Sequence, residues 1–280
     1  MARLTGCPAA DSSVHAYGRW VKVVALLFLV AALPARALET RWMEGTIRGF
    51  PVVRDADGHQ IGEGTLTQYI EDGKLHAQGI FDLRDGRRLH EEVVLEQRPR
   101  LRQLSWSWEE TKGGEVLRRF SVDLTTGHAV ARKRNGGGVD TWDDHLDGTR
   151  EAFAGVGFMY ALKNLTERLD KGEKIEVTAV VFTAKPRTVT VSISRDQVGE
   201  LAMGGRRLPA ARYVIHPDVP WFARLFVKAP DQYLWYYRPD PPAFLRADIP
   251  VAEPGDPMIR IELLPGTESR AVGRAPRRHR

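Results

Sequence analysis

The densest group of potential metal ligands in the sequence lies between two β-rich halves of the chain. Asp140, Asp143, Asp144, His145 and Asp147 fall within a single short stretch. Hard cations bind several oxygen ligands at once, so Asp143, Asp144 and Asp147 are the candidate metal ligands. The spacing lacks the ligand order of a calcium loop, however, and acidic residues before a helix are also favoured by the helix dipole. We therefore interpret the stretch as a solvated loop, and we predict no metal and no other cofactor.

Two other polar motifs resemble parts of known sites. The sequence DADG at residues 55–58 matches a fragment of a calcium loop, but the downstream glutamate is missing and a hairpin turn explains it. The sequence HEE at residues 90–92 lacks the second histidine of a zinc protease helix. No nucleophile elbow, phosphate-binding loop or dinucleotide fingerprint is present. The sequence thus contains no catalytic motif, and a hydrolase that uses Asp143 and Asp144 is the least supported hypothesis.

The segments around these motifs have the pattern of β-strands. Apolar and polar side chains alternate between residues 40 and 134, and turn dipeptides such as Asp72-Gly73 and Asp85-Gly86 separate the segments. Polar Gln103 and Ser105 fall on the predicted wet face. The predicted apolar faces contain Leu75, Ala77, Gly79, Phe81 and Leu83, then Leu104, Trp106 and Trp108, then Phe120, Val122 and Leu124. This half is predicted to be a run of consecutive antiparallel strands.

A predicted loop at residues 132–149 and a predicted helix at residues 151–169 follow this half. Phe158, Leu162, Leu165 and Leu169 recur at helical spacing, so we expect the helix to lie across a sheet. Alternation then returns, as in residues 187–194 and 258–263. The predicted fold is mainly β: a long antiparallel meander that forms a curved sheet or half-barrel, as one body or as two lobes, with one helix packed across it.

The N-terminus has the features of a secretory signal peptide. Arg19 and Lys22 precede an apolar run at residues 23–33, and small residues follow at the −3 and −1 positions of a site after Ala37. A membrane span needs about 20 apolar residues, so this run is too short. We predict cleavage between Ala37 and Leu38 and a periplasmic or secreted location, with no transmembrane span in the mature chain. The predicted parts are a signal peptide (1–37), a β-meander (38–135), a loop and helix (136–172), further strands (173–265) and a disordered basic tail (266–280).

Charge and cysteine content exclude several classes of function. The net charge of +5 falls to +2 in the predicted mature chain, because four of the 41 basic residues and one of the 36 acidic residues lie in the leader. A nearly neutral, exported chain is not expected to bind nucleic acid. Cys7 is the only cysteine and also lies in the leader, so disulfides and thiolate chemistry are excluded from the mature chain.

Two aromatic segments in the second half are candidates for binding. Residues 220–230 contain Trp221, Phe222 and Phe226, which indicate either a short helix that closes the sheet or a lid that touches a membrane. Residues 233–237 are aromatic on both faces, so this strand is predicted to be covered on both sides. A ligand groove lined by Tyr233 and Trp235 is the alternative.

The layout of leader, meander, crossing helix and closing strands around LWYYRPDPPAFLR (residues 234–246) resembles uncharacterised periplasmic β-rich families. It also resembles lipoprotein-carrier half-barrels of the LolA/LolB type. The resemblance implies a curved sheet whose hollow accepts acyl chains. The first hypothesis is a non-enzymatic periplasmic protein that holds a lipid or other amphiphile. The alternative is a structural or interaction module that binds an envelope protein. The candidate ligand-binding residues are Trp106, Trp108, Phe158, Tyr160, Leu162, Trp221, Phe222, Phe226, Tyr233, Trp235 and Tyr237.

Overall fold

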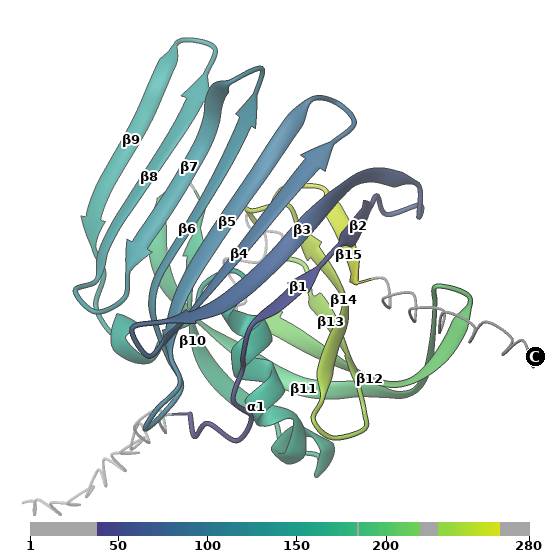
Figure 1. Cartoon of the computed structure of the whole chain (residues 1–280). Helices are drawn as coiled ribbons and strands as arrows, with labels where there is room; N and C mark the ends of the chain where they lie inside the picture. Colours follow the sequence, from purple (N-terminus) through teal and green to yellow (C-terminus); the bar gives the residue numbers. More distant parts are fainter. Residues whose placement is uncertain (1–37, 184, 219–228, 264–280) are drawn as a thin grey trace, which may run out of the picture. The chain divides into compact units, whose positions relative to one another are not determined.

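In the part of the chain that the structure describes, fifteen strands join in one antiparallel sheet (Figure 1). The computed structural model of the protein describes residues 38–183, 185–218 and 229–263. The predicted leader, the predicted tail and the residues Trp221, Phe222 and Phe226 lie outside the described residues. The strands are β1 Ile47–Gly49, β2 Pro51–Arg54, β3 Gln60–Glu71, β4 Lys74–Leu83, β5 Arg87–Glu96, β6 Arg102–Lys112, β7 Glu115–Asp123, β8 His128–Asn135, β9 Gly138–His145, β10 Ile175–Phe182, β11 Pro186–Met203, β12 Arg206–Pro217, β13 Gln232–Tyr237, β14 Ala243–Pro250 and β15 Met258–Leu263.

The strand order is β10-β11-β12-β13-β14-β15-β2-β3-β4-β5-β6-β7-β8-β9, and β1 also pairs with β3. Consecutive strands are therefore neighbours in the sheet from β2 to β9 and from β10 to β15, and β15 pairs with β2, which joins the two ends of the described chain. The sheet is not closed, because β9 and β10 are its two edges. The prediction of a mainly β fold built as a long antiparallel meander with one helix is confirmed, and the sheet is continuous.

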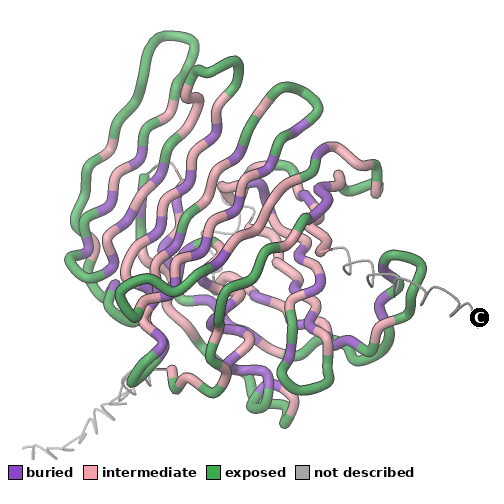
Figure 2. Tube along the Cα trace, viewed as in Figure 1, coloured by how far each residue is buried: buried purple, intermediate pink, exposed green. Residues whose placement is uncertain are grey.

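The two halves of the sheet pack against each other through an aromatic core. Trp106 from β6 lies 5.4 Å from Phe182 of β10 between ring centroids, and Phe120 of β7 stacks on the same Phe182 at 4.9 Å. Val251 and Ile259 from the β14–β15 region join this cluster. Buried residues alternate with partly buried or exposed ones along the strands, as Figure 2 shows for β4 to β8. One face of each half therefore supplies the common core.

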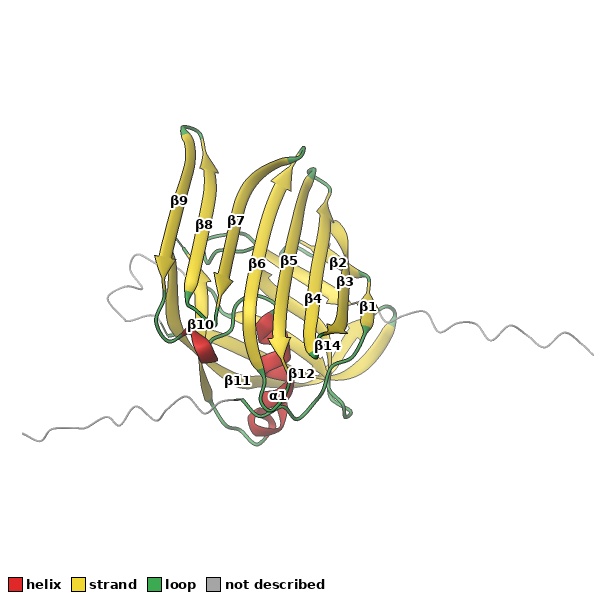
Figure 3. Ribbon diagram, turned by 60° about the vertical axis from the view of Figure 1, so that its left-hand side comes forward, coloured by secondary structure: helices red, strands yellow, loops and turns green. Residues whose placement is uncertain are grey.

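The helix α1 (Gly157–Asp170) lies between the two halves at one end of the sheet (Figure 3). Leu162, Leu165 and Leu169 pack on β10 to β13, whereas Tyr160 and Ala161 pack on β4 and β5. Because both halves bury a different stripe of the helix, α1 fixes their separation. No helix among the described residues is long and apolar enough to cross a membrane.

The helix begins later than the sequence pattern predicts. Residues Thr149–Glu151 form a short 3-10 helix, and Phe153 then makes a parallel bridge with Ala179 of β10. Gly155 adopts a positive φ of 50°, which interrupts the helical path before Gly157. The predicted start at residue 151 is wrong because this extended segment covers the edge of β10.

The predicted loop at residues 132–149 is also wrong over most of its length. Its first part is the end of β8, and β9 pairs with β8 over eight residues, from Asn135↔Gly138 to His128↔His145. The turn is closed by Asn135, whose Oδ1 accepts a hydrogen bond of 3.0 Å from the backbone N–H of Gly137. The acidic residues led to the prediction of a solvent-exposed loop. They are exposed, but on β9, which is an edge strand of the sheet.

A bulge in β6 reverses one predicted face. Leu95 pairs with Gln103 while Val94 pairs with Ser105, so Leu104 is the extra residue. Gln103 therefore turns inward and is buried, contrary to the predicted wet face, and Leu104 is only partly buried. The change of face matters because Gln103 holds the start of α1.

Candidate functional site

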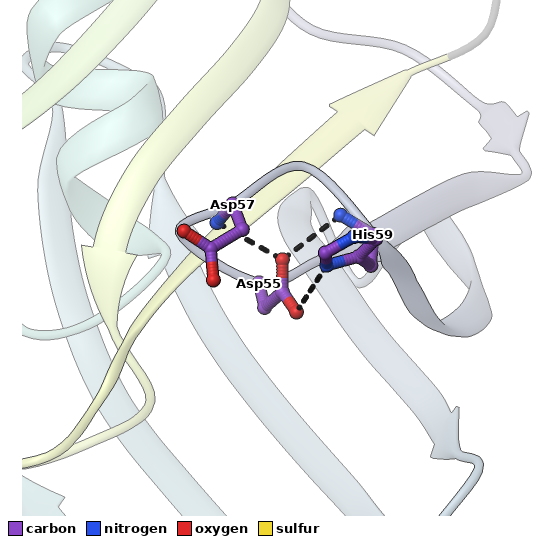
Figure 4. Close-up of side chains that lie close together, drawn as sticks. All are labelled: Asp55, Asp57 and His59. Atoms are coloured by element: carbon purple, nitrogen blue, oxygen red, sulfur yellow. Dashed lines mark hydrogen bonds and ion pairs between the residues drawn. The ribbon is translucent and has the colours of Figure 1, made fainter.

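The predicted metal ligands are not brought together. Asp143 and Asp144 are exposed on β9, and Asp143 pairs with Nε2 of His128 at 2.9 Å. Among the described residues, the group with metal-compatible spacing is Asp55, Asp57 and His59, in the β2–β3 turn (Figure 4). Its geometry is that of a turn, because Oδ1 of Asp55 accepts backbone hydrogen bonds from Asp57 and His59 at 3.0 and 2.9 Å.

Two predicted ligand residues belong to the packed core. Trp106 is 7% exposed and Trp108 is 4% exposed. Trp108 stacks on Phe120 with 5.5 Å between ring centroids, and the ring of Phe182 covers Phe120 from the other half of the sheet. The space that these tryptophans face is therefore filled by other side chains of the chain.

The predicted residues of β13 lie on the opposite face of their strand from the core. Leu234 and Tyr236 are buried inward, and Tyr233, Trp235 and Tyr237 are partly buried outward. Guanidinium groups cover the outward rings: Arg246 lies 4.3 Å from the centroid of Trp235. Both faces are covered, as the sequence predicts. The outer cover combines these guanidinium groups with an apolar cluster against which Trp235 and Tyr237 pack, formed by Leu201, Met203, Ala210 and Leu245.

The helix residues of the prediction divide between three surroundings. Leu162 is fully buried against the second half of the sheet, and Phe158 is partly buried with its ring 6.0 Å from that of Phe153. Of the predicted ligand residues that the structure describes, Tyr160 is the one that contributes both to the core and to a cavity.

This cavity has a volume of about 250 Å³ and lies where β1, β3 and β4 meet α1 and the β13–β14 hairpin. Apolar side chains form most of its wall. Four polar lining residues are joined by hydrogen bonds, and we call this group the polar end: Glu44, Gln68, Tyr160 and Lys163. The cavity is lined by Glu44, Ile47, Gly49, Leu66, Thr67, Gln68, Ala77, Gln78, Val156, Met159, Tyr160, Lys163, Tyr236, Ala243, Phe244 and Leu263. Its size is slightly below the ~300–1,000 Å³ of sites for drug-sized molecules.

The cavity exists because the sheet separates beside β1. Strands β15 and β2 share four residue pairs, the last of which is Leu263↔Pro51. Beyond this pair β1 continues along β3, and within the described residues it has no second partner strand. Gly49 permits the close approach of the two sides, since a Cβ at this position would lie 2.8 Å from Cδ2 of Leu263.

An ion pair lies at the polar end. Nζ of Lys163, on α1, donates to Oε1 of Glu44 at 2.5 Å, and the two side chains are only 14% and 10% exposed. The other carboxylate oxygen of Glu44 accepts a hydrogen bond of 3.1 Å from Nε2 of Gln68, on β3. The hydroxyl of Tyr160 donates to Oε1 of Gln68 at 3.0 Å. Burial, with the negative charges of Glu44 and Glu91, raises the pKa of Tyr160, so this hydroxyl keeps its proton.

Glu44 is delivered by the N-terminal strap, which we define as residues 38–46. The backbone N–H groups of Arg41 and Trp42 donate to Oδ1 of Asn164 on α1 at 2.7 and 2.8 Å. At its beginning, the carbonyl of Leu38 accepts a hydrogen bond of 2.9 Å from the N–H of Leu101. The strap thus crosses from the sheet to the helix.

The end of the strap is held by two glutamines. Gln97 accepts from the backbone N–H of Glu44 at 2.6 Å and donates to its carbonyl at 3.1 Å. Gln68 donates to the carbonyl of Gly45 at 2.9 Å. Carboxamides can donate and accept at once, which suits a segment that has few strand partners.

The start of α1 is held by a carboxylate from the sheet. Oε1 of Glu91, on β5, accepts from Nε1 of Trp106 at 2.6 Å and from the backbone N–H of Val156 at 2.7 Å. Loss of solvation raises the pKa of Glu91, and these two hydrogen bonds oppose the effect. Gln103 adds a hydrogen bond of 2.9 Å from the N–H of Ala154. The wall formed by Val156 and Tyr160 is therefore positioned by β5 and β6.

The sequence reasoning missed Glu44, Gln68, Glu91 and Lys163. For Glu91 a signal exists, because Leu89, Glu91, Val93 and Leu95 share one parity of β5 and the glutamate stands in an otherwise apolar row. Such a polar residue on a dry face is informative. Nothing in the local sequence indicates that Glu44 and Lys163 meet.

A cluster of charged side chains lies against the aromatic core, with Arg118 over the ring of Trp108 and Lys133 over that of Phe120. Arg118 of β7 donates to Glu110 of β6 at 2.7 Å and to Asp256 of the β14–β15 turn at 2.8 Å. Lys133 pairs with Glu253 in the same turn. These ion pairs connect the two halves of the sheet. They lie away from the cavity lining.

Comparisons with known proteins place the chain in no family. No family model matches the sequence, and no curated protein matches it. A β-barrel-like protein of the domain of unknown function DUF1849 from Brucella abortus is similar in structure, with a TM-score of 0.45, 12% identity and coverage of 81% of this chain and 98% of that chain. The hypothetical lipoprotein YmcC from Escherichia coli has a TM-score of 0.32 and 9% identity, with coverage of 78% and 84%. Both similarities are too distant to imply a shared ligand.

Proposed function

We propose that this protein binds a small amphiphile in the cavity between β1, α1 and the β13–β14 hairpin, without a chemical step. The observation that carries the proposal is the division of the cavity wall into an apolar part and a polar end. Leu66, Met159 and Phe244 offer contacts for an aliphatic chain, whereas Glu44 and Lys163 are close enough to hold a polar group. Apolar cavities with a few placed polar groups are typical of small-molecule sites.

The cavity size limits the ligand. One water takes about 30 Å³ in the liquid, so about 250 Å³ suits an aliphatic chain of moderate length with a small head group. The walls come from elements with independent support: Glu91 and Gln103 hold the start of α1, and a continuous ladder holds β3 and β4. A site of this kind binds with little rearrangement, which lowers the entropic cost of binding.

We also propose that the protein is exported after cleavage of its leader. Leu38, the first residue of the predicted mature chain, packs against the helix clusters, and its carbonyl is hydrogen-bonded to Leu101. Cleavage after Ala37 would leave the whole strap in place. N-terminal sequencing of the protein from a periplasmic extract tests this: a chain that starts at Leu38 supports export, and an uncleaved cytoplasmic chain contradicts it.

Ligand binding is tested by fluorescence titration with N-phenyl-1-naphthylamine, followed by displacement with octanoate. The variant Ala243→Trp fills the cavity from its exposed edge, and Ala202→Trp, on an exposed position of β11 outside the cavity lining, is the matched control. We expect one probe molecule per wild-type or Ala202→Trp protein and at least tenfold weaker binding by Ala243→Trp. No saturable binding by the wild type, or equal binding by both variants, overturns the proposal.

A further inference from the structure

At the polar end of the cavity the side-chain oxygens of Glu44 and Gln68 all have hydrogen-bond partners, whereas some N–H donors of Lys163 have none in the part of the chain that the structure describes. Each oxygen of Glu44 has a partner, Lys163 for Oε1 and Gln68 for Oε2, and Oε1 of Gln68 is bound by the Tyr160 hydroxyl. An ammonium group has three N–H donors. Within the described residues only one of those of Lys163 is used, by Glu44.

The unused donors matter because the Lys163 side chain is largely shielded from solvent. This side chain is 14% exposed and borders the cavity. An N–H donor that is shielded from water and has no hydrogen-bond partner destabilises the protein. This cost is larger than that of an oxygen that already accepts one hydrogen bond and leaves its second lone pair unused. The ligand atom that best completes this end is therefore a hydrogen-bond acceptor.

The donors of the neighbouring groups are already engaged. Nε2 of Gln68 donates to Glu44 and to the carbonyl of Gly45, and the Tyr160 hydroxyl donates to Gln68. The charges of Glu44 and Lys163 cancel, so this end does not require a ligand of net negative charge. Selectivity thus follows hydrogen-bonding type more than net charge.

From these contacts we infer that Lys163 selects an amphiphile whose head group presents an acceptor oxygen, the chemistry of an acyl carboxylate or an acyl ester, over one with an ammonium head group. The inference rests on the proposed function and specifies the ligand class of that same cavity. Lys163 would donate to the acyl oxygen while it remains paired with Glu44. The strap, which carries Glu44, would keep its position.

The test compares three ligands with the same eight-carbon chain by calorimetry: octanoate, methyl octanoate and octylammonium. We expect the wild type to bind octanoate or methyl octanoate at least tenfold more tightly than octylammonium. Octanoate represents a free fatty acid, and methyl octanoate represents an acyl ester. The ratio of their dissociation constants shows which of the two the cavity prefers.

The variants isolate Lys163. The double variant Lys163→Met with Glu44→Gln removes the donors without leaving an unpaired buried carboxylate, and it should bind the three ligands within about threefold of one another. Lys163→Arg retains donors and should retain the preference. Equal binding of all three ligands by the wild type, or an unchanged preference in the double variant, overturns the inference alone. If the wild type binds none of them and no naphthylamine probe, the proposed function itself fails.

Discussion

The indole Nε1 of Trp106 donates a hydrogen bond of 2.6 Å to Oε1 of Glu91, a carboxylate that stands in the apolar row of β5. The same oxygen accepts from the backbone N–H of Val156, so one partly buried acid joins two strands to the start of the helix. Burial is the dominant influence on this group and raises its pKa above the ordinary value of 4.5.

Glu91→Gln should therefore change how stability depends on pH. The folded protein retains the Glu91 proton at a higher pH than the unfolded chain does, so ionisation disfavours the folded state. The free energy of unfolding of the wild type, relative to Glu91→Gln, should fall as pH rises above 4.5 and level off above the folded-state pKa. Each unit of pKa shift corresponds to about 1.4 kcal/mol.

Urea denaturation between pH 4 and pH 8 measures this difference. Glu92→Gln, on the exposed face of the same strand, is the matched control for the removal of one carboxylate. A difference between wild type and Glu91→Gln that stays constant over this range would contradict the raised pKa.

Gly155→Ala should be strongly destabilising. A Cβ at this position would lie 2.0 Å from Nε1 of Trp106 and 2.1 Å from Oε1 of Glu91, and the backbone has a φ of +50°. Gly148 has a φ of +70° with no atom within 4 Å of its Cβ position, so Gly148→Ala reports the backbone strain alone. We expect Gly155→Ala to cost about 1–3 kcal/mol more than Gly148→Ala in thermal or urea unfolding. Equal destabilisation by the two variants would contradict this prediction, because it would mean that Trp106 and Glu91 move away from the new Cβ at no cost in stability.

Asn164→Leu should release the strap from α1. The substitution removes the acceptor of the Arg41 and Trp42 N–H groups, each worth about 1–3 kcal/mol when it is left unpaired. Hydrogen exchange at these two amides should accelerate at least tenfold, while the amides of β4 keep their protection. Asn164→Asp retains the oxygen and should preserve most of the protection. Unchanged exchange in Asn164→Leu would show that other contacts hold the strap.

Arg118→Met should destabilise the folded state by about 3–5 kcal/mol, because a buried ion pair loses one partner. The side chain of Glu110 is 4% exposed, and after the substitution it would depend on Arg87 alone. Arg88→Met breaks a pair whose side chains are 60% and 59% exposed, so solvent screens the pair and its loss should have a much smaller effect. Adding Glu110→Gln to Arg118→Met should recover part of the loss. Similar effects of Arg118→Met and Arg88→Met in urea denaturation would contradict the role of the buried cluster.

Much of the fold was predictable because alternation and turn dipeptides are local signals. The apolar row of β4 and the row from Phe120 to Leu124 were assigned to the correct face. The bulge at Leu104 was not predictable from the pattern, since the register of β5 against β6 determines it. The β8–β9 hairpin was missed because an exposed edge strand contains the same polar residues as a loop.

The candidate site was less predictable than the fold. Among the aromatic residues predicted to bind a ligand, Tyr160 lines the cavity, whereas Trp106 and Trp108 belong to the core. The other polar residues of the cavity were not predicted. Glu44 and Lys163 are far apart in sequence, and only the path of the strap over α1 brings them together. A contact of this kind depends on topology, which has no local signature.

The strap is attached to the helix and the sheet by the carboxamides of Asn164, Gln97 and Gln68. An amide side chain has no ionisable proton in the range where the fold survives, and its dipole is weakly screened by dissolved ions. The strap should consequently keep its carboxamide contacts through shifts in acidity or salinity that would weaken its ion pairs, Glu44 with Lys163 and Arg41 with Glu167. This property would suit the exported location proposed above.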